Sequence, residues 1–149
     1  MNIHPIGSRK IKDAATPVLT AQQALQAAAD MVPRLAARAA ESERLRRVHP
    51  TTIAELRSTG LMRLMQPTRF GGSELGLNDL MNVVFELARG CASTAWVYSN
   101  LASHSWNLGQ FELQAQEDIW NEDPNALAAT GLAFPCGRAV PVEGGYRLT

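Results

Sequence analysis

Cysteine is scarce in this chain, and its scarcity limits both the compartment and the chemistry. The 149 residues contain only Cys91 and Cys136, which form neither a metal-ligand spacing nor a disulfide framework. A chain without disulfides is typical of a reducing compartment, so the sequence predicts a cytoplasmic protein. The lack of a metal-ligand spacing predicts no metal site. Cys91 has no base beside it in the sequence, and interior packing explains it better than nucleophilic catalysis.

An excess of charge and a long apolar run are also missing. Fourteen basic and fourteen acidic side chains cancel, so nothing predicts binding to nucleic acid or to an acidic membrane surface. No apolar segment approaches the ~18 residues that a membrane span needs. The basic N-terminus is not followed by the apolar core of a secretory signal.

Alanine and leucine are abundant, and they recur with helical periods over residues 20–124. Thr20 and Gln23 match a capping box, and the alanine-rich segment after them continues to about Arg47 with Pro33 in its interior. A proline inside a helix costs about 3 kcal/mol, so this segment is either one bent helix or two short ones. Its expected buried stripe consists of Leu25, Ala28, Val32, Leu35, Ala36 and Ala39.

Four more helices are expected in this part of the chain. His49-Pro50 starts the first of them, Gly60 ends it, and the apolar run 61–67 is interpreted as a short connector. The others are expected over 78–89 with Asn78 as N-cap, from Ser93 onward, and over 111–120.

After Pro124 the pattern changes to strands and turns, with a hairpin signal at Gly144-Gly145. Thr149 falls within the second expected strand, so we expect the front part of a longer protein. The predicted fold is mainly α, with a mobile lead-in over 1–19, a helical domain over 20–124 and the start of a truncated β domain over 125–149.

Polar and aromatic side chains interrupt the helix that starts at Ser93. Trp96, Asn100 and His104 are spaced at i, i+4 and i+8, which places them near one helix face. Such a face suits the wall of a cavity for a flat ring with polar edges. Partly buried Trp and His in an ordinary core give the same pattern, and the residues alone leave both interpretations open.

The segment GLMRLMQPTRFGGSELGLNDLMNVVFELARGCASTAWV resembles the N-terminal helical domain of the acyl-CoA dehydrogenase superfamily. The resemblance rests on the Phe70–Gly72 turn, on Glu86–Arg89 at the end of a helix, and on the small-residue junction Ala92–Thr94. It covers the chain from about residue 20 to its end and implies the superfamily's helical domain followed by a middle β domain.

The later residues resemble one branch of that superfamily. AWVYSNLASHSWNLGQF and PCGRAVPVEGGYRLT are similar to oxygenase components of two-component flavin-dependent aromatic monooxygenases, of the p-hydroxyphenylacetate hydroxylase type. The resemblance implies that Trp96 and His104 border the flavin pocket. Thr130 stands where the family has a serine beside the flavin, although one extra residue follows it. Asn100 joins this set as a cofactor-binding candidate because it shares the helix face.

The resemblance also implies a reaction and its partners. Reduced FMN or FAD, supplied by a separate flavin reductase, reacts with oxygen to give a C4a-hydroperoxide, which hydroxylates a phenolic or other aromatic substrate. Catalytic residues, much of the flavin site and the contacts of a homotetramer are expected in a C-terminal part beyond Thr149. We therefore expect no catalytic residue within this chain, and we expect the chain alone to be inactive and to bind flavin weakly.

Two other functions fit the residues. The first is a fragment of an acyl-CoA dehydrogenase, which the Trp96/His104 pair and the short link from Gln114 to Pro124 disfavour. The second is a helical interaction module without catalysis, which the strand pattern after Ala126 disfavours, because that pattern begins a sheet.

Overall fold

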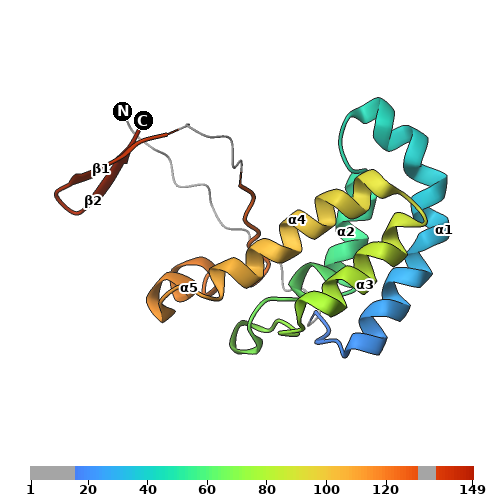
Figure 1. The fold of residues 1–149 in the computed structure, drawn as a ribbon, viewed down its shortest axis with the longest axis horizontal. Helices are drawn as coiled ribbons and strands as arrows, with labels where there is room; N and C mark the ends of the chain where they lie inside the picture. Colours follow the sequence, from blue (N-terminus) through green and yellow to red (C-terminus); the bar gives the residue numbers. More distant parts are fainter. Residues whose placement is uncertain (1–15, 131–136) are drawn as a thin grey trace.

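The computed structural model describes residues 16–130 and 137–149, and α-helices dominate the first range (Figure 1). The helices are α1 (Ala21–Leu45), α2 (Pro50–Ser58), α3 (Leu77–Ala88), α4 (Ala92–Leu108) and α5 (Leu113–Trp120), with short 3-10 helices η1 (Leu61–Arg63) and η2 (Thr68–Phe70). A hairpin of β1 (Ala139–Val142) and β2 (Gly145–Leu148) follows. The predicted fold class is confirmed. Residues 1–15 of the expected lead-in, and Cys136, lie outside the described residues.

The capping box at the start of α1 forms as predicted. Thr20 N–H donates to Gln23 Oε1 at 2.9 Å, and Gln23 N–H donates to Thr20 Oγ1 at 3.3 Å. The helix then continues through Pro33 as a single element, so the two-helix alternative is wrong. Pro33 is exposed, which keeps its ring away from the packed side of the helix.

The buried stripe of α1 differs from the predicted one. Its buried residues are Ala24, Ala28, Met31 and Leu35. Of the other predicted residues, Val32 and Ala39 are partly buried and Leu25 and Ala36 are exposed. Further along, α1 closely approaches the turn after α3: a Cβ at Gly90 would lie 2.6 Å from Val32 O and 2.8 Å from Leu35 Cβ. The elements that pack against α1 decide which of its residues are buried, and a count of large apolar residues does not reveal that choice.

His49 and Pro50 start α2 as expected. Thr51 N–H donates to His49 Nδ1 at 3.2 Å, and Pro50 occupies the first turn. Gly60, at φ 85°, turns the chain just beyond the helix end. An ion pair joins α1 to α2, since Arg38 Nη2 and Glu55 Oε1 lie 2.8 Å apart.

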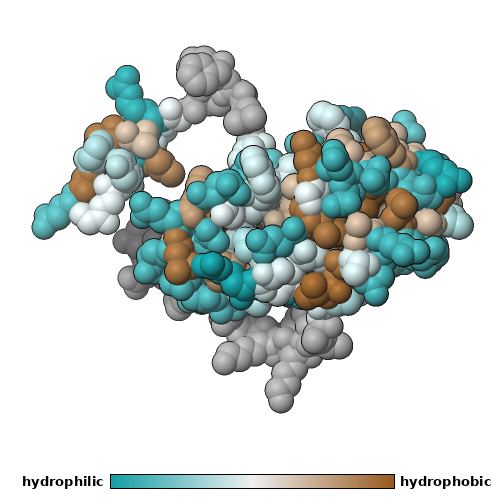
Figure 2. Space-filling model, turned by 60° about the horizontal axis from the view of Figure 1, so that its bottom comes forward, coloured by the Kyte–Doolittle hydropathy of each residue, from teal (hydrophilic) through white to brown (hydrophobic). Residues whose placement is uncertain are grey.

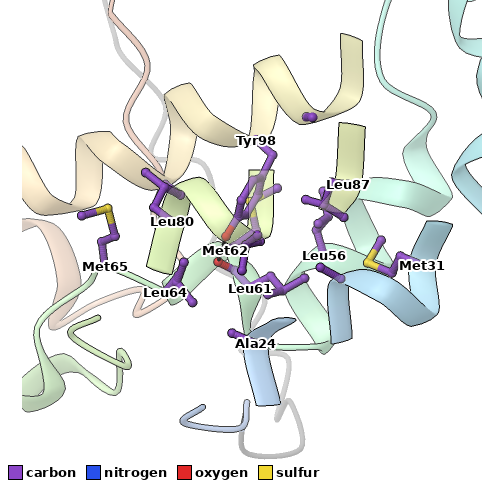
Figure 3. Close-up of a cluster of buried hydrophobic side chains, with 14 of the residues drawn as sticks. Ala24, Met31, Leu56, Leu61, Met62, Leu64, Met65, Leu80, Leu87 and Tyr98 are labelled. Atoms are coloured by element: carbon purple, nitrogen blue, oxygen red, sulfur yellow. Dashed lines mark hydrogen bonds between the residues drawn. The ribbon is translucent and has the colours of Figure 1, made fainter. Parts of the chain in front are cut away.

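The segment predicted as a connector is instead the centre of the core. Residues 61–66 are all buried, and η1 contacts α1, α2 and α4. Figure 3 shows Leu61, Met62 and Leu64 beneath the ring of Tyr98. The Tyr98 hydroxyl donates to Leu61 O at 3.2 Å, and burial raises its pKa. The apolar side chains of this segment hold the helices together, so it is more than a link between two of them.

Two predicted helix starts need correction. Helix α3 begins at Leu77 after Gly76, whose N–H donates to Asp79 Oδ2 at 3.3 Å, so Asn78 is not the cap. Helix α4 begins at Ala92, one residue before the expected Ser93. The predicted α3 stripe is confirmed: Leu80, Val83 and Leu87 are buried and Val84 is partly buried.

The predicted hairpin forms with a two-residue turn. Val142 pairs with Gly145 and Ala139 with Leu148, so the turn consists of Glu143 and Gly144. Gly144 has φ 78°, a conformation that favours glycine. Arg138 and Thr149 extend the pairing by exchanging backbone hydrogen bonds of 2.7 and 3.0 Å.

Candidate functional site

Helix α4 has one packed face and one open face. Its packed face consists of small residues and one tyrosine: Thr94, Ala95, Tyr98, Ala102 and Ser105. These residues bring the helix against α3 and η1. The indole of Trp96 is left 72% exposed on the other side, with Asn100 also exposed. Figure 2 shows that exposed apolar groups form separate patches between hydrophilic residues on the face it presents.

His104 connects α4 to the segment that follows α5. One ring nitrogen, Nδ1, contacts the carbonyl oxygen of Asn100, and the other, Nε2, lies 2.7 Å from Thr130 Oγ1. Only a protonated nitrogen can bond to a carbonyl, so the bonding pattern assigns the hydrogen to Nδ1. In the neutral ring Nε2 then accepts a hydrogen bond from the Thr130 hydroxyl. The oxygen of that hydroxyl keeps its lone pairs available to an external donor.

Asn100 takes part in this arrangement through its backbone as well as its side chain. Its carbonyl oxygen accepts from His104 and, at 3.0 Å, from Ser103 Oγ. Its amide Nδ2 donates to Trp96 O at 2.9 Å. The structure thus brings His104 and Thr130 into direct contact and links Asn100 to both His104 and Trp96 along the helix.

The segment that leads to Thr130 is tied to the helical body at two earlier points. Gln66 Nε2 donates to Phe70 O at 2.9 Å and to Pro124 O at 3.0 Å, which ties the glycine turn to the segment that follows α5. Trp120 Nε1 donates to Ala126 O at 3.3 Å. These bonds fix the segment at Pro124 and Ala126, and the bond between Thr130 and His104 joins its later part to α4.

The interpretation of residues 61–67 as an apolar connector does not predict this role of Gln66. The sequence does contain an indication of it, because Arg63 and Gln66 are polar residues within an otherwise apolar run. Both are buried in the structure. A polar side chain in such a run is a candidate for an internal hydrogen-bonding role.

Other chemistry is limited in the residues that the structure describes. Within residues 16–130 and 137–149, no three His, Cys, Asp or Glu side chains are placed to hold a metal ion. Over the same residues no helix combines the length and the apolar character that crossing a bilayer requires. Cys91 is partly buried at the N-cap of α4 and packs against the core.

Comparisons with known proteins agree on one family. The profile of the acyl-CoA dehydrogenase N-terminal domain matches residues 19–120. The oxygenase component of p-hydroxyphenylacetate 3-hydroxylase from Acinetobacter baumannii is 39% identical over 135 residues, which cover 91% of this chain and 32% of that protein. The oxygenase component of FADH2-dependent resorcinol hydroxylase from Rhizobium sp. (strain MTP-10005) is 40% identical over 111 residues, 74% of this chain and 27% of that protein.

The fold agrees with the same group of enzymes. The crystal structure of the HsaA monooxygenase from M. tuberculosis matches with a TM-score of 0.81 at 35% identity, over 87% of this chain and 35% of that one. XiaF from Streptomyces sp., in complex with FADH2 and glycerol, matches with a TM-score of 0.80 at 28% identity, over 86% of this chain and 32% of that one. The chain thus spans about a third of the length of these relatives.

Proposed function

Because this chain belongs to the acyl-CoA dehydrogenase superfamily, through its N-terminal domain, we propose that it is part of the oxygenase component of a two-component flavin-dependent monooxygenase. The proposed reaction is the hydroxylation of a phenolic or other aromatic compound. Two similar proteins are named as oxygenase components of aromatic hydroxylases, which supports this reaction over acyl-CoA oxidation.

The observation that carries the proposal is the His104–Thr130 hydrogen bond beside the open face of α4. A flavin has a flat ring system with hydrogen-bonding atoms along its edge. It therefore needs an aromatic or apolar surface together with a few fixed polar groups. The open face offers the exposed indole of Trp96 and the imidazole–hydroxyl pair. These residue types fit a flavin.

We assign each of these residues a role toward bound flavin. Trp96 packs against the ring system and shields it from water. His104 orients the Thr130 hydroxyl, and both hydrogen-bond the polar edge of the flavin or substrate. Asn100 holds His104 through its carbonyl oxygen and lines the same face. Reduced FMN or FAD supplies the oxygen-activating chemistry, while these residues position groups and exclude water.

The proposal includes partners and a further domain. A flavin reductase would deliver the reduced flavin, since relatives are named as components, and oxygen and an aromatic compound would be the substrates. Residues 125–149 would begin a β domain, because the β1–β2 hairpin exposes Tyr146 and Leu148 as if for further packing. Assembly into a homotetramer and a cytoplasmic location belong to the same proposal.

The test is an activity assay on the protein made from the full reading frame that contains this chain. We expect oxygen consumption and a hydroxylated product when a flavin reductase, NADH and a phenol are added together. Reduction of an artificial dye by an acyl-CoA, without hydroxylation, would establish a dehydrogenase instead. A frame that ends after Thr149, with neither activity, would favour a helical interaction module.

A further inference from the structure

Three consecutive backbone carbonyls after α5 each accept a hydrogen bond from a side chain of the helical body. The acceptors are Pro124 O, Asn125 O and Ala126 O, and their donors are, in that order, Gln66 Nε2 at 3.0 Å, Arg57 Nη1 at 3.3 Å and Trp120 Nε1 at 3.3 Å. The donors come from three separate parts of the fold: the buried segment 61–66, α2 and α5. One short stretch of backbone is therefore held from three sides.

Gln66 makes the shortest of these three bonds and uses its amide fully. Its side chain is 0% exposed, whereas Arg57 is exposed and its bond competes with water. The second hydrogen on Nε2 is donated to Phe70 O at 2.9 Å. Two carbonyl acceptors also fix the orientation of the amide, because a flipped amide would place its own oxygen against both.

The held stretch lies close in sequence to the His104–Thr130 pair. Leu127 follows the last held carbonyl and packs against the hydrophobic core. Only two alanines then separate it from Thr130, whose Oγ1 lies 2.7 Å from His104 Nε2. Each residue adds at most about 3.6 Å of reach. Anchoring of the three carbonyls therefore limits where the Thr130 hydroxyl can lie.

We propose that Gln66 is a positioning residue for the His104–Thr130 pair and acts through its bond to Pro124 O. Loss of that bond lets the segment shift, so that the Thr130 hydroxyl spends time away from His104. The effect on the pair follows from the contacts alone. The consequence for hydroxylation rests on the proposed function, which places this pair at the polar edge of the flavin or substrate.

Gln116 provides a matched control. It is also a buried glutamine, 8% exposed, and its Nε2 also donates to two carbonyl oxygens, Gly109 O at 3.1 Å and Phe111 O at 2.7 Å. Both acceptors lie between α4 and α5, outside the segment that leads to Thr130. Gln66→Met and Gln116→Met therefore remove the same group and should lower the Tm comparably, but only Gln66→Met releases that segment.

The first experiment follows the imidazole nitrogens of His104 by 15N NMR in the 149-residue chain, with the ring neutral. The Nε2 resonance of the wild type reports the hydrogen bond from Thr130, and Thr130→Val gives its position without that bond. We expect Gln66→Met to move the resonance most of the way to the Thr130→Val position. Gln116→Met should leave it in place. A resonance that stays at the wild-type position in folded Gln66→Met overturns the proposal.

The second experiment covers the case in which Gln66→Met does not fold as the 149-residue chain. It measures the ratio of hydroxylated product to hydrogen peroxide in the protein made from the full reading frame. Gln66→Met should lower this ratio about tenfold, as Thr130→Val does, and Gln116→Met should not. The double variant Gln66→Met/Thr130→Val should be no worse than Thr130→Val alone, because both changes remove the same bond. Effects that multiply would show general destabilisation and overturn the positioning role.

The two experiments separate this inference from the proposed function. A shifted Nε2 resonance in Gln66→Met, with a wild-type protein that forms no hydroxylated product, would support the positioning role and reject the monooxygenase. Hydroxylation by the wild type, with an unchanged resonance in Gln66→Met, would support the monooxygenase and reject the positioning role.

Discussion

His104 on α4 and Thr130, 26 residues further along the chain, are joined by a hydrogen bond of 2.7 Å between Nε2 and Oγ1. The bond connects a helix of the N-terminal domain to the segment that leads to the hairpin. It gives the open face of α4 a polar pair whose hydroxyl oxygen can still accept a hydrogen bond.

Replacement of the Thr130 hydroxyl should impair hydroxylation. In the full-length protein, Thr130→Val keeps the side-chain shape but removes the hydrogen bond, and a lost bond of about 1.4 kcal/mol corresponds to tenfold. We expect about a tenfold lower ratio of hydroxylated product to released hydrogen peroxide. Thr130→Ser should behave as wild type, and Ser103→Ala is the control because that hydroxyl bonds only to its own helix, at Asn100 O. Equal effects of Val and Ser at position 130 would contradict the assignment.

Trp96 should report directly on flavin binding. An anaerobic titration of the full-length protein with reduced flavin should quench tryptophan fluorescence. Trp96→Phe should remove most of this quenching and weaken binding by about tenfold, which corresponds to about 1.4 kcal/mol of lost contact. Trp106→Phe is the matched control, because Trp106 is also exposed, at 52%, on the same helix. If Trp106→Phe removes the quenching instead, the flavin does not bind at Trp96.

Gly90 should tolerate no side chain. A Cβ there would lie 2.6 Å from Val32 O and 2.8 Å from Leu35 Cβ, so Gly90→Ala must push α1 away from the turn after α3. We expect a loss of about 2–3 kcal/mol in the free energy of unfolding, measured by urea denaturation. At Gly76 the nearest atom to a new Cβ is Asp79 Oδ2 at 3.9 Å, so Gly76→Ala should cost less than about 1 kcal/mol.

The ion pair between α1 and α2 should make stability depend on pH. The hydrogen bond from Arg38 holds the pKa of Glu55 below its ordinary value of 4.5, and Arg34 adds to the effect. A lowered folded-state pKa means that the carboxylate stabilises the fold above pH 4.5 and loses this contribution as the pH falls through the lowered pKa.

Glu55→Gln therefore tests that pair. Its free energy of unfolding should be about 1 kcal/mol below wild type at neutral pH, and the two proteins should converge in acid. Glu43→Gln, at an exposed position of α1, should show no difference at either pH. A deficit that persists unchanged in acid would mean that Glu55 acts by packing and not by its charge.

The sequence by itself determined the features that depend on a few neighbouring residues. Thr20 with Gln23 and His49 with Pro50 predicted helix starts correctly, and Gly144 predicted the hairpin. Capping and turn formation are decided by hydrogen bonds and backbone angles within about four residues, so local pattern is sufficient. The family resemblance was also available from sequence, because its motifs are local.

The tertiary structure alone decided how those elements meet. It buried residues 61–66 at the centre, where the sequence suggested a connector, and it chose Ala24 over Leu25 for the packed side of α1. Both outcomes depend on which other elements pack against the segment, and the segment itself does not encode them. The contact between His104 and Thr130 is of the same kind. It requires the segment after α5 to reach α4, and Gln66 and Trp120 tie the start of that segment to the helical body through hydrogen bonds to Pro124 O and Ala126 O.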